Sequence, residues 1–472
     1  MASSEILFKS IAELAPLLKS RKLSPVEVVR AFLDRIEAVN PRVNAFITVT
    51  GEQALEQARA AEKEIAAGRY RGPLHGVPYA PKDMLATRGV RTTNGSKVTS
   101  GWVPDYESTV TARLNQAGAI LIGKLNLLEF AMGSGQRGLI GPAHNPWDLA
   151  YSPSGSSSGS GAAVAAGMVP LAIGSDSGGS IRNPAKSCGI AGLKPTYGRV
   201  STFGVTTLSW TLDHVGPMAK TVADTACVLQ AIAGADPRDP AASRAPVPDY
   251  TKPLGGAVKG LRIGVPTEHY FDHVHPETDA ALRRALSLLR QMGALLVDVK
   301  VRNAALCGVV SSTILGSEAA AFHQKRLKTR GNLMEPLVRE RLEASSFYSA
   351  VDYIKALRLR TVLMEEMRRV FKTCDILMLP AGNAAPKLEE EIAGTDAPPD
   401  PPLPPRPDSY NIANVTGIPA IVLPCGFTTG PPALPLGIQF CARPFDEAML
   451  FRIGHAYQTA TDWHLRKPPL NG

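Results

Sequence analysis

The sequence has 472 residues, of which 44% are hydrophobic and 20% are charged, and this ordinary globular composition argues against overall disorder. The net charge of +9 comes from 51 basic and 42 acidic residues that form no dense basic patch with interleaved aromatics, which disfavours a nucleic-acid binder. No apolar run approaches the length of a membrane span, and the N-terminus lacks the apolar core of a signal peptide. We therefore expect a cytoplasmic protein that binds neither nucleic acid nor membrane.

The first elements that the sequence predicts are two helices. Ser24 to Glu27 combine a capping box with a proline at the first helical position, and apolar residues recur at helical spacing as far as Val39. A second helix is predicted over about 52–67, with Gly68 able to end it.

Further along, short apolar runs alternate with helical segments. Strands are predicted over 119–122, 169–173, 295–301, 376–379, 420–423 and 436–440, and helices over 162–166, 276–292 and 353–371. This alternation predicts an α/β fold with a largely parallel sheet that helices cover.

Two segments could interrupt this pattern. The proline-rich run over 396–407 is interpreted as a stiff surface loop, and the stretch over 236–253 as a second excursion. Composition is similar on both sides of each, and no repeat of fixed period is present. We predict a single domain over 1–472.

Cysteine and histidine spacing gives no sign of a metal or redox centre. The six cysteines include no Cys-x-x-Cys pair, and the nine histidines lack ligand spacing. Cysteines scattered in apolar contexts suit a reducing compartment. No metal site is predicted.

The most informative region is the serine- and glycine-rich stretch over 152–200. A flexible linker would not enclose a small-residue helix followed by an apolar strand. A Walker loop needs a lysine that is missing, and the glycine spacing does not fit a dinucleotide site. Acyl transfer remains, because Ser177-Gly178-Gly179-Ser180 follows a strand and its glycines let backbone N–H groups face one concavity around a reactive serine.

These residues resemble the amidase signature family. The Gly/Ser run over 154–160 and Gly178-Gly179-Ser180-Ile181-Arg182 match its motif, and family-like segments extend across most of the chain. These are GPLHGVPYAPKD (72–83), NPWD (145–148), GLKPTYGRVS (192–201), LDHVGPMA (212–219), NVTGIPAIVLPCGF (414–427) and GIQFCARPFDEA (437–448). The resemblance implies a large mixed, mostly parallel twisted sheet covered by helices on both faces. It also implies a signature core over about 72–220 and a variable helical substrate-pocket region over about 302–371.

The resemblance also implies a catalytic set. Ser180 is the expected nucleophile, Ser156 the bridging serine after a cis peptide bond, and Lys82 the base. A lysine can serve as base only when neutral, and burial can lower its pKa enough to keep it so. A serine hydroxyl can relay a proton because it both donates and accepts. Neither a metal nor an organic cofactor is expected.

Each catalytic assignment has a competing interpretation. Lys82 could form a surface ion pair with Asp83, and Ser157 could be the bridging serine instead of Ser156. His214, beside Asp213, could be the base of a Ser-His-Asp triad, although side chains of adjacent residues diverge. We interpret His214 as structural.

Other site residues surround this set. The oxyanion hole is predicted from the backbone N–H groups of Ser177, Gly178, Gly179 and Ser180. Asp176 and Arg182 should brace the loop, and Met132, Gly133 and Ser134 should line the substrate pocket. The sequence departs from the usual family pattern at Ser154, Ser158, Pro81 and Met84, which leaves the shape of the pocket and the substrate open.

The expected function is hydrolysis of C–N bonds in small amides, and the same machinery would suit carbamates (urethanes) and aryl esters. The expected partner is the small-molecule amide or carbamate substrate, and the expected assembly is a homodimer. The alternative is the ammonia-supplying subunit of a glutamine-dependent amidotransferase, which would pass ammonia to a partner protein. A catalytically silent binding protein is disfavoured because Lys82, Ser156 and Ser180 are all present.

Overall fold

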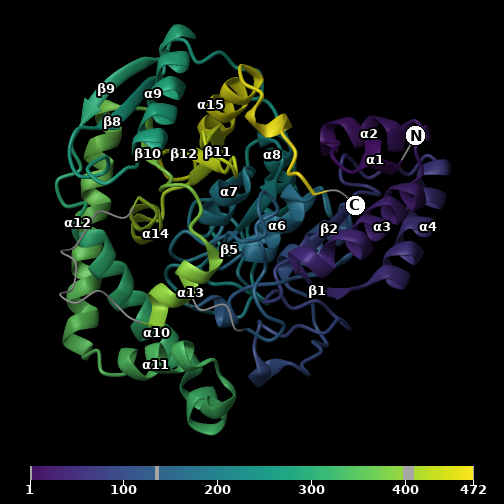
Figure 1. Ribbon diagram of the computed structural model, residues 1–472, viewed down its shortest axis with the longest axis horizontal. Helices are drawn as coiled ribbons and strands as arrows, with labels where there is room; N and C mark the ends of the chain where they lie inside the picture. The colour runs from purple at the N-terminus through teal and green to yellow at the C-terminus, as the bar shows by residue number, and fades with distance from the viewer. Residues whose placement is uncertain (1–2, 133–137, 397–408, 471–472) are drawn as a thin grey trace.

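The computed structural model describes residues 3–132, 138–396 and 409–470, and its elements are shown in Figure 1. The α-helices are α1 (Ser3–Ile6), α2 (Ile11–Lys19), α3 (Pro25–Val43), α4 (Gly51–Ala66), α5 (Thr109–Gln116), α6 (Ser158–Ala165), α7 (Arg182–Cys188), α8 (Val222–Ile232), α9 (Pro276–Gln291), α10 (Leu306–Arg330), α11 (Pro336–Ser345), α12 (Ala350–Thr373), α13 (Leu388–Asp396), α14 (Asn411–Thr416) and α15 (Glu447–Thr459). The strands are β1 (Phe46–Val49), β2 (Pro78–Pro81), β3 (Ile120–Leu121), β4 (Gly123–Leu125), β5 (Leu171–Asp176), β6 (Ala191–Lys194), β7 (His214–Ala219), β8 (Arg262–Pro266), β9 (Leu295–Val299), β10 (Ile376–Pro380), β11 (Ala420–Phe427) and β12 (Pro435–Cys441). Four short 3-10 helices are η1 (Lys97–Thr99), η2 (Glu129–Ala131), η3 (Gly331–Leu333) and η4 (Trp463–Leu465).

A ten-stranded sheet organises the molecule, in the order β3-β2-β5-β7-β6-β11-β12-β10-β8-β9. The strands pair in parallel at both ends of the sheet, in β3-β2-β5 and β10-β8-β9. The pairs between β5 and β10 are antiparallel. The predicted α/β fold with a large mixed sheet is confirmed, and its antiparallel centre is a feature that the alternation of strands and helices did not reveal.

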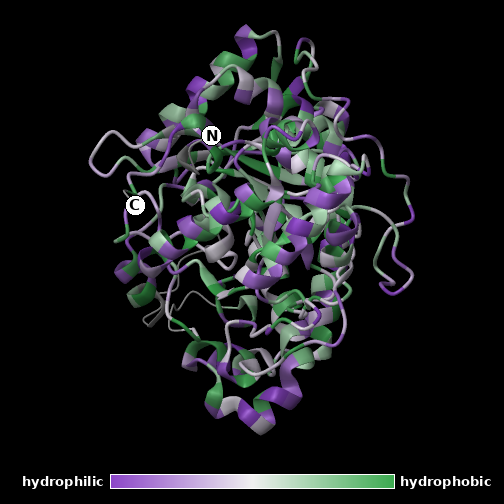
Figure 2. Cartoon of the chain, turned by 90° about the vertical axis from the view of Figure 1, so that its right-hand side faces the viewer, coloured by the Kyte–Doolittle hydropathy of each residue, from purple (hydrophilic) through white to green (hydrophobic). Residues whose placement is uncertain are grey.

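Helices cover both faces of this sheet, as predicted. Leu423 of β11 lies opposite Ile438 of the paired strand β12, so these two side chains face the same side of the sheet. Gly437 is the residue before Ile438 in β12. Side chains alternate between faces along a strand, so Leu423 and Gly437 face opposite sides. Leu423 packs against Gly454 of α15, whereas Gly437 packs against Lys186 of α7. Figure 2 shows the apolar strands inside and polar residues on the outer helices.

The predicted helix boundaries are close to those observed. The capping box at Ser24 and Glu27 forms in full, and the helix that follows is α3. α4 ends at Ala66, just before Gly68, which has a φ of +78° that favours glycine. The local chemistry of the termini therefore decides where these helices begin and end.

The predicted variable region forms a long helical arm made of α10, α11 and α12, seen at one side of the sheet in Figure 1. A buried apolar cluster joins α10 and α12 to β10 and α14. The outer face of α12 keeps large apolar side chains exposed, among them Val351 and Ile354. No helix in the described ranges is long and apolar enough to cross a membrane.

Candidate active site

Two parallel neighbours in the sheet, β2 and β5, bring the predicted base and nucleophile loop to one edge. The register aligns Pro81 with Ile173, and each strand ends within three residues of that pair. Lys82 follows β2 directly, and Ser177 follows β5. Carboxyl ends of parallel strands meet at the same edge of a sheet, where ligands bind in such folds. The predicted position of the glycine loop at a strand end is confirmed.

Lys82 is fully buried and contacts two serine hydroxyls. Its Nζ lies 2.7 Å from Ser156 Oγ and 2.8 Å from Ser175 Oγ. The Gly155–Ser156 peptide bond is cis, as the family resemblance implied. Ser175 was missed in the sequence, because β5 is buried on both faces and its pattern does not reveal which side chain faces the lysine.

The surroundings of Lys82 favour its neutral form. Burial lowers the pKa of Lys82 to about 7, while the more distant carboxylates of Asp176 and Asp213 act in the opposite direction. Within the described part of the chain no carboxylate forms an ion pair with Lys82. A substantial fraction of this lysine is therefore neutral near pH 7 and can accept a proton.

The two serines that competed for the bridging position have different partners. Ser156 Oγ contacts Lys82, whereas Ser157 Oγ exchanges hydrogen bonds with the backbone of Ser175, at 3.2 and 3.3 Å. The Ser157 N–H donates to the Ser180 carbonyl at 3.2 Å. The backbones of the two serine loops are therefore neighbours, and Ser156 is the serine that touches the lysine.

Asp176 and Arg182 form a buried pair that contacts the glycine loop. Arg182 Nε and Nη2 each lie 3.0 Å from an Asp176 carboxylate oxygen, and both residues are buried. Arg182 also donates to Gln439 Oε1 and Asn414 Oδ1. Burial alone would raise the pKa of Asp176, but Arg182 holds that pKa well below its usual range. The loop is therefore anchored by a charge pair whose remaining hydrogen bonds are satisfied.

The prediction for Gly179 needs a correction. Its N–H donates to Asp176 Oδ1 at 2.8 Å, so it braces the loop and is not free for an oxyanion. Its φ is +115°, and a Cβ at this position would lie 2.8 Å from Tyr410 Cγ. Of the four predicted oxyanion donors, the N–H groups of Ser177, Gly178 and Ser180 remain.

Asp213, which the sequence suggested only as a partner of His214 in a triad, is a further residue of the site. Ser177 Oγ donates to Asp213 Oδ1 at 2.5 Å, and the Leu208 N–H donates to Asp213 Oδ2 at 2.9 Å. Burial raises the pKa of Asp213 to about 6, against the lowering effect of these hydrogen bonds. Asp213 thus positions the first residue of the loop and holds a negative charge near Lys82 above that pH.

His214 has no role as a base in this arrangement. It is buried in β7, and its Nδ1 lies 2.6 Å from the Leu212 carbonyl oxygen and 3.1 Å from that of Asp176. Burial, with the nearby charge of Lys194, lowers its pKa well below the usual value. Asp213 contacts Ser177 instead of His214, so no Ser-His-Asp triad is assembled.

The alternative ion pair between Lys82 and Asp83 does not form. Asp83 Oδ1 lies 3.2 Å from the Nζ of a second buried lysine, Lys124. Asp83 Oδ2 accepts hydrogen bonds from the N–H and hydroxyl of Thr93, at 2.8 and 2.5 Å. The ion-pair partner of Asp83 is therefore Lys124, and Lys82 contacts serine hydroxyls instead.

The predicted pocket residues are described only in part. Met132 is buried beside η2, and its N–H donates to the Glu129 carbonyl at 2.9 Å. Gly133 and Ser134 lie outside the described residues, as does nearly all of the proline-rich segment over 396–407. No cluster of metal-ligating side chains occurs among the residues that are described.

Comparisons with known proteins give matches over most of the chain. A family model described as Amidase matches residues 27–451. The chain is 41% identical to the A subunit of the glutamyl-tRNA(Gln) amidotransferase of Moorella thermoacetica, over 99% of each chain. In structure it is similar to a chain from a vestigial protein complex connected with the evolutionary origins of an s-triazine catabolic enzyme, with a TM-score of 0.88, 33% identity and coverage of 96% of this chain and 98% of that one. It is also similar to the peptide amidase of Stenotrophomonas maltophilia, with a TM-score of 0.85, 30% identity and coverage of 98% of each chain.

Proposed function

Because the chain belongs to the amidase signature family, we propose that it breaks the C–N bond of an amide through an acyl-enzyme on Ser180. The observation that carries the proposal is the contact of Lys82 Nζ with Ser156 Oγ at 2.7 Å, in a buried site that lowers the pKa of the lysine to about 7. This arrangement supplies a neutral base and a hydroxyl that can relay a proton to it.

The proposed reaction has two stages. The Ser180 oxygen attacks the carbonyl carbon, its proton passes to Ser156, and the proton of Ser156 passes to Lys82. The N–H groups of Ser177, Gly178 and Ser180 stabilise the oxyanion. The proton then returns to the leaving nitrogen as the C–N bond breaks, which leaves the acyl group on Ser180. Water attacks the ester carbonyl and gives one proton to the same relay. As the C–O bond to Ser180 breaks, the relay returns that proton to the Ser180 oxygen and the acid is released.

We further propose that the substrate amide is glutamine and that ammonia passes to a partner protein. The 41% identity with the A subunit of a glutamyl-tRNA(Gln) amidotransferase, over 99% of both chains, supports this choice. Ammonia is the smallest leaving group that the mechanism can release, and a chain that supplies it needs a partner that uses it. The partner is therefore expected to be a second, different chain, in place of the homodimer considered from the sequence.

A free amidase is the second candidate, and the similarity in fold to a peptide amidase favours it. In that case the isolated chain would cleave an amide whose acyl side occupies the pocket. Carbamates and aryl esters need no additional catalytic group, so they remain possible substrates of a free enzyme.

The location and the single domain also remain proposals. One buried apolar cluster includes residues from Ile6 to Tyr457, which supports one folding unit over the chain. All six cysteines are free, which suits the reducing cytoplasm.

The deciding experiment measures ammonia release from glutamine and aniline release from anilides, with the chain alone and with proteins that co-purify from its own host. Glutamine turnover that requires a co-purifying chain supports the amidotransferase. Anilide turnover by the isolated chain supports the free amidase. The variant Ser180→Ala should lose at least about 10³-fold in either activity while keeping the melting temperature. Wild-type turnover by that variant would refute the acyl-enzyme.

A further inference from the structure

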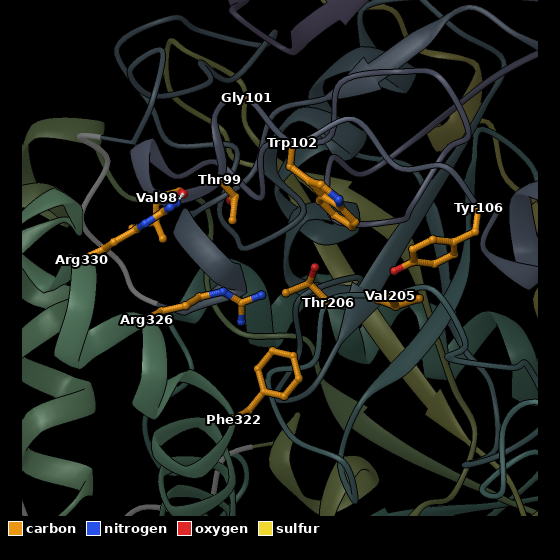
Figure 3. Close-up of a pocket in the computed structure, with 10 residues that line it drawn as sticks. All are labelled: Val98, Thr99, Gly101, Trp102, Tyr106, Val205, Thr206, Phe322, Arg326 and Arg330. Carbon is orange, nitrogen blue, oxygen red and sulfur yellow. Dashed lines mark hydrogen bonds between the residues drawn. The ribbon is translucent and has the colours of Figure 1, made fainter.

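A cavity of about 490 Å³ lies between the segment around η1 and the C-terminal half of α10. Figure 3 shows its walls, to which Trp102, Tyr106 and Phe322 contribute aromatic rings. The Arg326 guanidinium points into the space between Trp102 and Phe322, and Thr206 lies opposite it. This volume is within the range of roughly 300–1,000 Å³ that small-molecule sites occupy.

The charge in this cavity is positive and uncompensated. Arg326 and Arg330 are one helical turn apart on α10, and neither forms an ion pair with a carboxylate in the described ranges. Arg326 Nη1 lies 3.4 Å from His323 Nδ1, and Arg330 Nη1 donates to the Val98 carbonyl at 3.0 Å. A guanidinium has five N–H donors, so most of those on each arginine remain available.

Arg326 is held in place by aromatic rings. Its guanidinium carbon lies 5.1 Å from the centroid of the Phe322 ring and 5.8 Å from that of Phe130. Burial lowers the pKa of Arg326, which means that its charge is partly desolvated. A partly desolvated cation without a carboxylate partner gains more from a bound anion than an exposed one does.

The walls favour a flat ligand body. The centroids of the Trp102 and Tyr106 rings are 6.4 Å apart. The centroid of the Phe322 ring lies 6.0 Å from that of the exposed Trp210. Aromatic faces bind planar apolar groups by stacking or by edge contacts. The cavity therefore combines a positively charged end with aromatic walls.

The cavity also lies next to the segment that supports the active site. The Thr206 N–H donates to the carbonyl of Met84, two residues beyond Lys82. Two residues after Thr206, the Leu208 N–H donates to Asp213, which accepts the Ser177 hydroxyl. A ligand in contact with Thr206 would therefore lie one hydrogen bond from the segment that follows Lys82 and two residues from the segment that holds Asp213.

We propose that this cavity binds a flat organic carboxylate, with the carboxylate on Arg326 and Arg330 and the planar part between Trp102, Tyr106 and Phe322. The carboxylate could be the distal end of the amide substrate or a separate small molecule. Both sources present the same chemistry to the arginines, and the site exists whether or not the glutamine proposal holds.

The test is calorimetric titration with 2-naphthoate and with the uncharged 2-naphthalenemethanol. Wild-type protein should bind the carboxylate at least about tenfold more tightly than the alcohol, because charge-assisted hydrogen bonds to arginine require the anion. Arg326→Gln should weaken naphthoate binding at least about tenfold, and the exposed Arg330→Gln should weaken it by a smaller factor. Lys328→Gln is the matched control, since it removes a positive charge from the same helix outside the cavity.

Equal affinity of naphthoate for Arg326→Gln, Arg330→Gln and Lys328→Gln, or equal binding of acid and alcohol, would overturn the proposal. Arg330→Gln keeps the test valid if Arg326→Gln unfolds, because Arg330 is exposed. The source of the ligand follows from labelling Ser180 with a fluorophosphonate. Protection by naphthoate places the carboxylate in the substrate site, and unchanged labelling identifies a separate ligand.

Discussion

The molecule buries two lysines at neighbouring strand ends, Lys82 after β2 and Lys124 in β4, and gives them different partners. Lys124 lies 3.2 Å from the carboxylate of Asp83 and donates to the Leu85 carbonyl at 2.9 Å. The partners of Lys82 are instead the hydroxyls of Ser156 and Ser175. Burial lowers the pKa of both lysines, and Asp83 opposes that effect at Lys124 through direct contact.

The difference in partners distinguishes Lys124, a lysine in a structural ion pair, from Lys82, a lysine that can act as a base. At Lys124 the contact with the Asp83 carboxylate forms a buried ion pair and opposes the lowering of the lysine pKa by burial. Without such a contact, Lys82 can lose its proton near neutral pH and exchange protons with a hydroxyl. Burial of a lysine alone therefore says little about function, and the chemistry of its contacts decides.

The largest effects should come from replacing each lysine by methionine. Lys82→Met should lower turnover at least about 10³-fold, because the base is lost, with a smaller effect on stability. Lys124→Met should instead reduce the free energy of unfolding by about 3–5 kcal/mol, because the buried charge of Asp83 loses its partner. Steady-state turnover and chemical denaturation, measured on both variants, would show which variant loses activity and which loses stability. A Lys82→Met variant with wild-type turnover would contradict it.

The adjacent serines Ser156 and Ser157 allow the same comparison between a catalytic and a structural side chain. Ser156→Ala should lower turnover by about 10²–10³-fold, because it removes the hydroxyl that contacts Lys82 and that, in the proposed relay, passes on the proton of Ser180. Ser157→Ala removes hydrogen bonds to the Ser175 backbone and should cost about 1–3 kcal/mol of stability with much less loss of turnover per folded molecule. Steady-state kinetics corrected for the folded fraction would separate them. Equal losses of turnover would mean that the bridging serine is misassigned.

Asp213→Asn should give the smallest effect, a shift in the pH dependence of turnover. The negative charge of Asp213 raises the pKa of Lys82, so its removal should lower that pKa. The acid limb of the profile should move to lower pH by less than about one unit. Asp224→Asn is the control, because Asp224 is also buried with a pKa raised to about 6 but contacts the backbone near α2. A shift to higher pH in Asp213→Asn would contradict the account.

Parts of the fold and much of the site could be predicted because they depend on short stretches of sequence. The capping box at Ser24 set the start of α3, and the apolar run into Ser177 placed the glycine loop at a strand end. Motif positions singled out Lys82, Ser156 and Ser180, and the structure shows the Lys82–Ser156 contact and the backbone proximity of Ser157 to Ser180.

The rest depended on contacts between distant segments. Ser177 and Asp213 are 36 residues apart and meet only because β5 pairs with β7. The N–H of Gly179 is taken by Asp176, which no spacing rule indicates. Strands such as β7, with every residue buried, show no alternation of polar and apolar residues that would reveal which side chains face which side of the sheet. The arginine cavity likewise combines side chains that lie far apart in the sequence, from Val98 to Arg330.

The most direct test of the central claim, that neutral Lys82 activates Ser180 through Ser156, is the pH dependence of Ser180 labelling by a fluorophosphonate. The wild-type rate, followed by mass spectrometry of the Ser180 peptide, should rise about tenfold per pH unit at low pH and level off above pH about 7, where the pKa of Lys82 lies. Lys82→Met should label far more slowly and lose this titration. A Lys82→Met variant that labels at the wild-type rate with the same profile, or label found on another residue, would contradict the claim.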